Sequence, residues 1–162
     1  MGEEAHEETF DSRSGYLLAV DAALARARKE ICVFDADLKV IDLGGVERAE
    51  SLSAFLSGGR DRSVRIALHD TEHVERNCPR IMALLVRFSH SFSIRQTPDG
   101  LRHLADCFVI VDKSNAVVRF HADYSRGKLL LALPDETLPW CQRFEDIWLE
   151  SQPALSPTQL GL

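Results

Sequence analysis

The chain has 162 residues, a formal net charge of −6, and a composition that is 45% hydrophobic and 27% charged. This length fits one domain, which can bury roughly two-thirds of its unfolded surface without help from a disulfide or a metal. A negative chain disfavours sequence-independent binding to a nucleic-acid backbone, which needs clustered Lys and Arg, but it leaves room for a local basic pocket. From overall charge we therefore expect no nucleic-acid partner.

The N-terminal residues are acidic, with Glu3, Glu4, Glu7 and Glu8 close together. Such a run predicts a disordered acidic tail over residues 1–11, followed by a single domain over residues 12–162. The start of the chain lacks the basic and apolar regions of a signal peptide, and no apolar run approaches 18 residues. We therefore expect a cytoplasmic protein with no membrane partner.

Helical and strand patterns alternate along the chain. An amphipathic stripe after a cap at Asp11 or Ser12 predicts a helix to about Glu30, and further helices are expected over 46–56, 74–88 and 135–151. Apolar runs predict strands over 31–34, 63–68, 91–97 and 107–111, and the last of these returns as a hairpin over 116–120. This order predicts an α/β fold: a mixed, mainly parallel sheet with helices on both faces.

Polar side chains gather where these strands end. In such a sheet, ligands bind outside the carboxyl ends of the strands, so we expect an anion- or ligand-binding site drawn from Asp35, His69, Asp112, Arg119, His121 and Arg126. Arg119, His121 and Arg126 are the strongest anion-contacting candidates. The alternative is that these side chains cap turns or charge an edge strand, as Asp and His often do for local reasons.

The four cysteines, Cys32, Cys78, Cys107 and Cys141, are far apart and form no C-x-x-C pair. This spacing predicts reduced, buried thiols and no metal site. Cys107 lies inside an apolar strand with nothing nearby to activate it, so we expect no nucleophile there. No cofactor is expected.

The segment from Ala105 to Asp112, with its return strand, resembles the core of the phospholipase D superfamily. That family carries H-x-K-x-x-x-x-D, followed by a strand. The apolar strand and Asp112 match the motif, but Ala105 stands at the His position and Cys107 at the Lys position. The resemblance implies a phospholipase D-like half-domain whose catalytic His and Lys are missing, and His103 lies two residues too early to replace the His.

The chain from about Ser12 onward also resembles a bacterial family of unknown function with a degenerate phospholipase D-like fold, sometimes linked to acetyltransferases. The supporting segments are Phe34-Asp35-x-Asp37-Leu38, Leu68-His69-Asp70, Cys78-Pro79-Arg80, Asp106-x-Phe108-x-Ile110-x-Asp112, Phe144-x-x-Ile147-Trp148 and the terminal Leu-Gly-Leu.

Three functions are compatible with these observations. The first is a non-catalytic binding or regulatory module, with an anion pocket for a phosphate-containing ligand or a protein partner. It could self-associate as a homodimer through its apolar C-terminal segment, including Trp140, Trp148 and Leu160–Leu162. The second is a divergent phosphodiesterase or nuclease that uses His121 or His103 as its nucleophile. The third is a non-catalytic nucleic-acid-binding protein.

Overall fold

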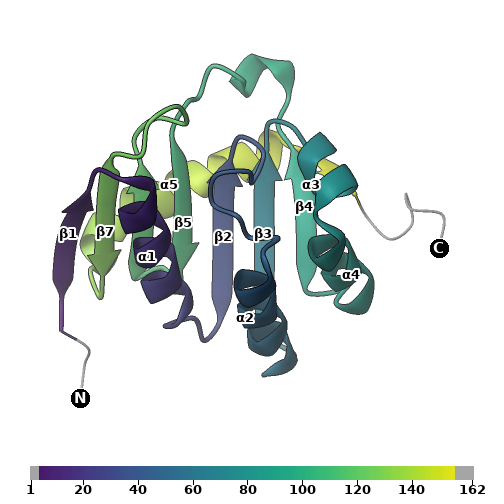
Figure 1. Ribbon diagram of the computed structural model, residues 1–162, viewed down its shortest axis with the longest axis horizontal. Helices are drawn as coiled ribbons and strands as arrows, with labels where there is room; N and C mark the ends of the chain where they lie inside the picture. Colours follow the sequence, from purple (N-terminus) through teal and green to yellow (C-terminus); the bar gives the residue numbers. More distant parts are fainter. Residues whose placement is uncertain (1–3, 156–162) are drawn as a thin grey trace.

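The computed structural model describes residues 4–155, which form one eight-stranded sheet flanked by helices (Figure 1). The strand order is β1-β7-β6-β5-β2-β3-β4-β8. The strands are β1 (His6–Phe10), β2 (Glu30–Asp35), β3 (Ser63–Leu68), β4 (Phe92–Gln96), β5 (Cys107–Val111), β6 (Asn115–Arg119), β7 (Gly127–Leu131) and β8 (Gln152–Ala154). The α-helices are α1 (Arg13–Leu24), α2 (Val46–Ser57), α3 (Glu72–Asn77), α4 (Pro79–Arg87) and α5 (Pro134–Glu150).

The mixed sheet with helices on both faces is confirmed, but antiparallel pairings outnumber parallel ones. β2 pairs in parallel with β3, and β3 with β4, because a helical crossover connects each pair. β5 runs antiparallel to β2, and the segment from β5 to β7 is a meander of antiparallel neighbours. The sheet is therefore not mainly parallel. β5, β6 and β7 are joined by turns of three residues or more, and strands joined directly by a turn run antiparallel.

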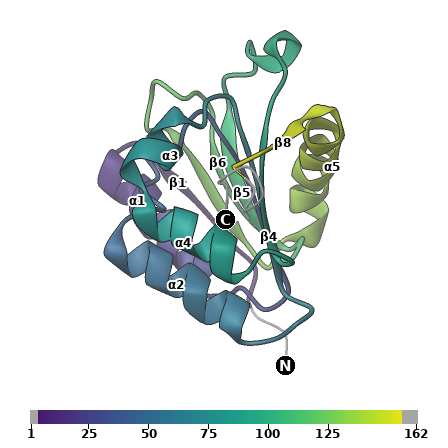
Figure 2. The ribbon, with the colours of Figure 1, turned by 90° about the vertical axis from the view of Figure 1, so that its right-hand side faces the viewer.

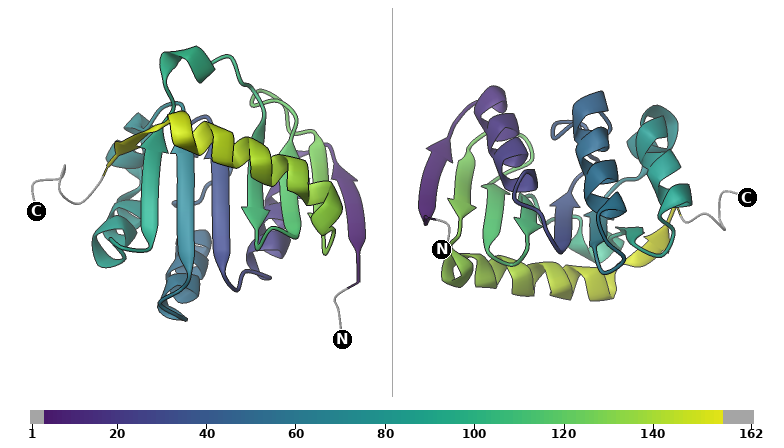
Figure 3. Two further views of the ribbon diagram at one scale, coloured as in Figure 1. Left: turned by 180° about the vertical axis from the view of Figure 1, so that it is seen from behind. Right: turned by 90° about the horizontal axis from the view of Figure 1, so that it is seen from below.

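Two helical layers enclose the sheet. α1, α2, α3 and α4 cover one face, and α5 crosses the other face alone (Figures 2 and 3). Side chains alternate along each strand, so Ile31 and Val33 of β2 join the core under the first layer, whereas Cys32 and Phe34 join the core under α5. Both faces of β2 are consequently apolar, as its continuous apolar run predicts.

The start of the chain differs from the expected tail. Residues 6–10 form the edge strand β1, which pairs antiparallel with β7 from His6 opposite Leu131 to Phe10 opposite Gly127. The acidic side chains of β1 are exposed, and the backbone groups that face β7 pair with it. Charge patterning describes the side chains correctly but does not reveal this backbone pairing.

Several boundaries also differ from the sequence pattern. α1 ends at Leu24, short of Glu30, and residues 25–29 form the connection into β2. The single helix expected around 74–88 is two helices, because Pro79 begins α4 and cannot continue α3. β7 and β8 were not expected; β7 supplies the strand between the hairpin and β1. The terminal Leu-Gly-Leu lies outside the described residues.

The tryptophans of α5 contribute to the core rather than to an open surface. Trp148 is buried and stacks on Phe144, and Trp140 packs against Phe108 of β5. Trp148 is therefore enclosed in the core, and Trp140 is partly buried at its margin. Within residues 4–155, no helix is both long and apolar enough to cross a membrane.

Gly127, at the start of β7, provides a test of how closely the meander strands approach. A Cβ at this position would collide with the carbonyl oxygen of Val118 and with the ring of Phe10. We expect Gly127→Ala to lower the free energy of unfolding by about 1–3 kcal/mol, because the backbone must shift to relieve the overlap. Gly100→Ala is the matched control, since nothing lies within 4 Å of its added Cβ. Urea unfolding of both variants measures the difference, and equal stabilities would contradict the close approach.

Candidate functional site

The sheet has two edges at which loops meet. The upper edge, in the orientation of Figure 1, contains the carboxyl ends of β2, β3, β4 and β6 and the start of β5. The lower edge contains the starts of β2, β3 and β4 and the end of β5. In an open α/β sheet the upper edge is where a ligand is expected.

A buried ion pair occupies the middle of the upper edge. Arg119, at the end of β6, places its Nη2 atom 3.5 Å from Oδ1 of Asp35, at the end of β2, and both side chains are almost fully buried. Arg119 also donates through Nη1 to the carbonyl oxygen of Ala122 at 2.7 Å, and its guanidinium lies 5.0 Å from the ring centroid of Tyr16. The second carboxylate oxygen of Asp35 accepts the backbone N–H of Leu38 at 2.7 Å.

The neighbours of this pair are kept neutral by burial. Burial raises the pKa of the Cys107 thiol, and the nearby Asp35 carboxylate raises it further. Burial likewise raises the pKa of the Tyr16 hydroxyl, with Asp35 adding to the effect. Burial opposes the charge of Arg119, but Cys107, Tyr16 and Asp35 outweigh it and raise the pKa of Arg119. Arg119 and Asp35 thus form the ion pair of a closed cluster that also contains Cys107 and Tyr16.

This arrangement corrects the expected role of two candidate residues. Arg119 was expected to contact an external anion, but its guanidinium is directed at Asp35, Ala122 and the face of Tyr16. Asp35 is committed to Arg119 and to the backbone of the loop that follows β2. A ligand would have to break buried hydrogen bonds to reach either side chain.

His69 directly follows β3 at the same edge, but its ring lies on the other side of the sheet. Its ring meets Phe34 edge-on at 5.2 Å, while Nδ1 lies 2.6 Å from the hydroxyl of Thr97 and Nε2 lies 2.8 Å from the carbonyl oxygen of Leu104. Leu104 can only accept, so Nε2 donates and Nδ1 accepts from Thr97. Both ring nitrogens are used, and His69 fixes the loop between β4 and β5 instead of facing a ligand.

Asp112 lies at the lower edge, far from the other candidates. β5 runs antiparallel to β2, so the end of β5 reaches the start of β2. The Asp112 carboxylate there accepts the backbone N–H groups of Arg28, Lys29 and Glu30 at 2.8–2.9 Å. It therefore ties the α1–β2 connection to the hairpin turn and is not part of the upper-edge site.

His121 and Arg126 are the two candidates that the structure brings together at an accessible place. They line a hollow of about 500 Å³ on the upper edge with Tyr124, Ser125, Phe120 and Asp11. Nδ1 of His121 accepts the backbone N–H of Asp123 at 3.1 Å, which orients the ring beside Tyr124. Tyr124 and Phe120 are exposed. Arg126 supplies a permanent positive charge, the hydroxyls of Tyr124 and Ser125 can donate hydrogen bonds, and Asp11 opposes an anion on one side.

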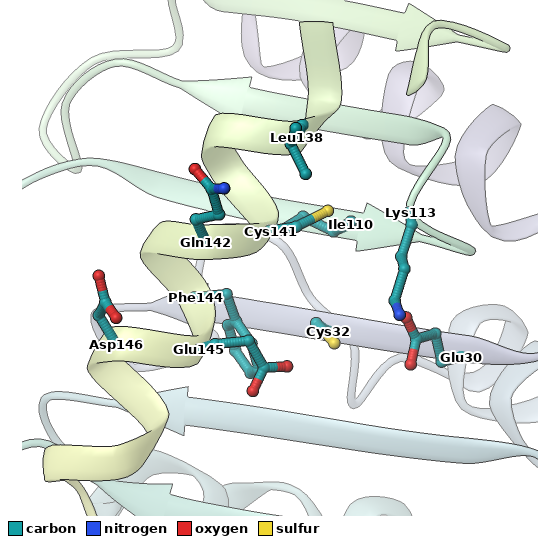
Figure 4. A pocket seen from close by; sticks show the side chains of 10 residues that line it. All are labelled: Glu30, Cys32, Ile110, Lys113, Leu138, Cys141, Gln142, Phe144, Glu145 and Asp146. Carbon is teal, nitrogen blue, oxygen red and sulfur yellow. The ribbon is translucent and has the colours of Figure 1, made fainter. Parts of the chain in front are cut away.

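A second hollow, of about 420 Å³, lies between α5 and the sheet (Figure 4). Ile110, Leu138 and Phe144 form its apolar lining, Lys113 and Glu30 face each other at its mouth, and Cys32 and Cys141 lie on opposite walls. Burial raises the pKa of Cys32 to about 12, so its thiol is protonated and a poor nucleophile. Among residues 4–155, no group of three or more His, Cys, Asp and Glu side chains is arranged to hold a metal ion.

The positions that match the phospholipase D motif lie beside the buried pair. Cys107 begins β5 and contacts Arg119 through its sulfur, with Nη2 3.5 Å away. The carbonyl oxygen of Ala105 accepts the N–H of Ala122, which closes the loop after β6 over this region. The space around the matching Lys position is therefore filled by Arg119, and His103 is exposed in the preceding loop.

Comparisons with known proteins show the family and the fold of this chain. A family model described as "Domain of unknown function (DUF7931)" matches residues 13–159. The chain belongs to this family. No curated protein matches its sequence significantly.

Among solved structures, Nuc from Salmonella typhimurium, a phospholipase D family member, matches with a TM-score of 0.63 and 15% identity over 93% of this chain and 99% of its own. NucT from Helicobacter pylori matches with a TM-score of 0.65 and 9% identity over 93% of this chain and 100% of its own. The archaeal chromatin protein TrmBL2 matches with a TM-score of 0.69 and 13% identity over 94% of this chain, which spans 56% of that chain's length.

This member of the family therefore has a phospholipase D-like fold, as its strand–Asp–strand pattern predicted. At these identities the likeness shows the fold alone. TrmBL2 is described as having a novel mode of DNA binding, so the fold occurs in a DNA-binding protein as well as in phospholipase D family members.

The buried pair should govern stability at the upper edge. We expect Arg119→Met to lower the free energy of unfolding by about 3–5 kcal/mol, because it leaves the Asp35 carboxylate buried without its cation. The double variant Asp35→Asn/Arg119→Met removes both charges while Asn can still accept the Leu38 N–H, so it should be more stable than the single variant. Chemical denaturation measures both. A single variant as stable as wild type would contradict a closed, buried pair.

Proposed function

We propose that this chain is a non-catalytic phospholipase D-like module that binds a phosphate-containing ligand at the upper-edge hollow lined by His121, Tyr124, Ser125 and Arg126. The observation that carries the proposal is which residues stand at the His and Lys positions of the phospholipase D motif. Ala105 and Cys107 offer neither a nucleophile nor a phosphate-holding ammonium, and Arg119 fills the space beside them in a closed pair with Asp35. What the scaffold retains at this edge is an open, polar hollow.

The hollow suits a small anion with hydrogen-bond acceptors. Arg126 can donate two parallel hydrogen bonds to phosphate oxygens, and the Ser125 and Tyr124 hydroxyls can donate one each. His121 adds a donor from its Nε2 atom, since its Nδ1 accepts the Asp123 N–H. Asp11 on one wall favours ligands that carry a donor group as well as phosphate.

Titration with inorganic phosphate tests this site. Amide resonances of residues 120–126 should shift on titration, and Arg126→Gln should weaken binding about tenfold, because one lost charge-assisted hydrogen bond contributes about 1.5 kcal/mol. Arg102→Gln is the control, since Arg102 lies at the same edge but bonds to the carbonyl oxygen of His69. Binding that is equal in both variants would contradict the assignment.

The divergent-phosphodiesterase alternative is favoured by one observation, the presence of His121 and Arg126 in the same hollow. It makes a contrary prediction for the same protein. Hydrolysis of bis(p-nitrophenyl) phosphate that is abolished by His121→Ala would overturn the non-catalytic proposal, because a nucleophilic His cannot be replaced by Ala. Absence of turnover in the wild-type protein, together with phosphate binding, supports the module.

We also propose that the protein self-associates through the rim of the same hollow. Phe120 and Tyr124 are 49% and 68% exposed, and two apolar rims facing each other across a two-fold axis would bury them. We expect wild-type protein to sediment as a dimer, and a Phe120→Ser/Tyr124→Ser variant to sediment as a monomer with unchanged circular dichroism. Leu18→Ser/Leu149→Ser, at two other exposed apolar positions, is the matched control. A monomeric wild-type protein at all concentrations would contradict this part.

A further inference from the structure

β1 is the outermost strand on one side of the sheet, and within residues 4–155 no strand pairs with its outer side (Figure 1). An outermost strand leaves part of its backbone N–H and C=O groups unpaired, and these can bond to a further strand. β8, the outermost strand on the other side, is only three residues long and contains Pro153. β1 contains no proline and pairs with β7 without interruption, so its outer side suits the addition of a strand.

The backbone groups on the outer side of β1 belong to Glu7 and Thr9. The N–H of Phe120 donates to the carbonyl oxygen of Arg126, and bonded pairs recur at every second residue of an antiparallel ladder. The even-numbered residues of β7 therefore bond to β6, and its odd-numbered residues bond to β1. Their partners in β1 are even-numbered, which leaves the N–H and C=O groups of Glu7 and Thr9 pointing outward.

A hollow of about 430 Å³ lies next to this strand, between β1 and α1. The exposed side chain of Leu18 and the partly buried ring of Phe10 belong to its wall. Gly15 also lines it, and a Cβ at Gly15 would lie 3.1 Å from the Cβ of Phe10, so a side chain there would narrow the hollow. Alternate side chains of an added strand would project to this side of the sheet, where the hollow can receive an apolar one.

The side chains of β1 oppose pairing with a second copy of itself. Two β1 strands can pair antiparallel about a two-fold axis centred on residue 6, 7, 8 or 9, with the outward backbone groups bonded. These registers place Glu4 opposite Glu8, Glu7 opposite Glu7, Glu8 opposite Glu8, and Glu7 opposite Asp11, respectively. Like charges directly opposite each other destabilise a sheet, so a second β1 is a poor occupant.

The same side chains fit a basic strand. Glu7 and Glu8 are exposed and point to opposite faces of the sheet, so a neighbouring strand would place a Lys or Arg beside each of them at two successive positions. His6 contacts Glu8 at 3.1 Å but adds no permanent charge. Two cations lie nearby, but Lys128 belongs to β7, one strand further in, and Arg13 begins α1.

We propose that the outer side of β1 binds an extended basic segment of a protein partner, which adds to the sheet as a further strand. Such a segment presents two successive basic residues to Glu7 and Glu8. Two positions beyond the second of these, opposite Phe10, it presents an apolar side chain to the hollow beside Leu18. Main-chain hydrogen bonds to Glu7 and Thr9 supply affinity, and the two carboxylates and the hollow supply specificity.

An NMR titration with the acetylated peptide Val-Leu-Thr-Lys-Lys-Val tests the proposal. In antiparallel alignment its leucine lies opposite Phe10 and its lysines lie opposite Glu8 and Glu7. We expect the amide protons of Glu7 and Thr9 to exchange with solvent more slowly when the peptide is bound, because they become hydrogen-bonded. The amide protons of Glu8 and Phe10, which already face β7, should change little. The same peptide N-methylated at its threonine and second lysine should bind at least about tenfold more weakly, since it cannot donate to β1.

Charge reversal tests the specificity. Glu7→Lys/Glu8→Lys should bind the lysine peptide more weakly than wild type and bind Val-Leu-Thr-Glu-Glu-Val more tightly. Glu50→Lys/Glu75→Lys is the matched control, because it changes the net charge equally at exposed positions of α2 and α3 and should retain wild-type affinity. Circular dichroism checks that both variants are folded. Equal weakening in the two variants would overturn the proposal, because net charge rather than β1 would then decide binding.

Two further comparisons separate the hollow and the phosphate site. Leu18→Asn should weaken binding of the lysine peptide, whereas Leu149→Asn, at another exposed leucine, should not. Arg126→Gln should reduce phosphate binding without changing peptide binding. Absence of peptide binding, or binding that leaves the exchange of the Glu7 and Thr9 amides unchanged, would overturn the proposal. Slow exchange of these two amides in the wild-type protein without peptide would also overturn it, since a second copy would then cover β1.

Discussion

The buried pair of Asp35 and Arg119 is the constraint on which the upper edge depends. It joins the ends of β2 and β6, two strands separated in the sheet by β5, and Asp35 also holds the loop after β2 through the N–H of Leu38. A charged pair in the interior is stable only when its hydrogen bonds are made, so the loops that supply them are fixed as well. The same pair fills the space beside Cys107, which stands at the Lys position of the motif that the segment resembles.

The carboxylates at the two edges of the sheet have different partners. At the upper edge, Asp35 and Asp106 pair with Arg119 and Arg143, and Arg102 bonds to a carbonyl oxygen, whereas Arg126 lines an accessible hollow. At the lower edge, the Asp112 carboxylate accepts the backbone N–H groups of Arg28, Lys29 and Glu30, and it ties the start of β2 to the turn after β5.

Most strands and helices could be predicted from the sequence, because buried faces produce a regular pattern of apolar residues. The runs at Ile31–Phe34 and Cys107–Val111 are apolar at every position, and both are strands buried on two faces. β1 was missed because its exposed acidic side chains resemble a solvated tail, while its stability comes from backbone bonds to β7. The direction of β5 was missed for a related reason: apolar periodicity identifies a strand but carries no information on which neighbour it joins.

For the site, the sequence by itself determined that Ala105 and Cys107 stand where the phospholipase D motif, which this segment resembles, has its His and Lys, because residue identity is read directly from the chain. Only the tertiary structure decided which polar residues meet. Antiparallel pairing of β5 with β2 sends Asp112 to the lower edge, and side-chain alternation turns His69 and Asp35 to opposite faces. These outcomes depend on strand direction and register, which are set by contacts between segments far apart in the chain.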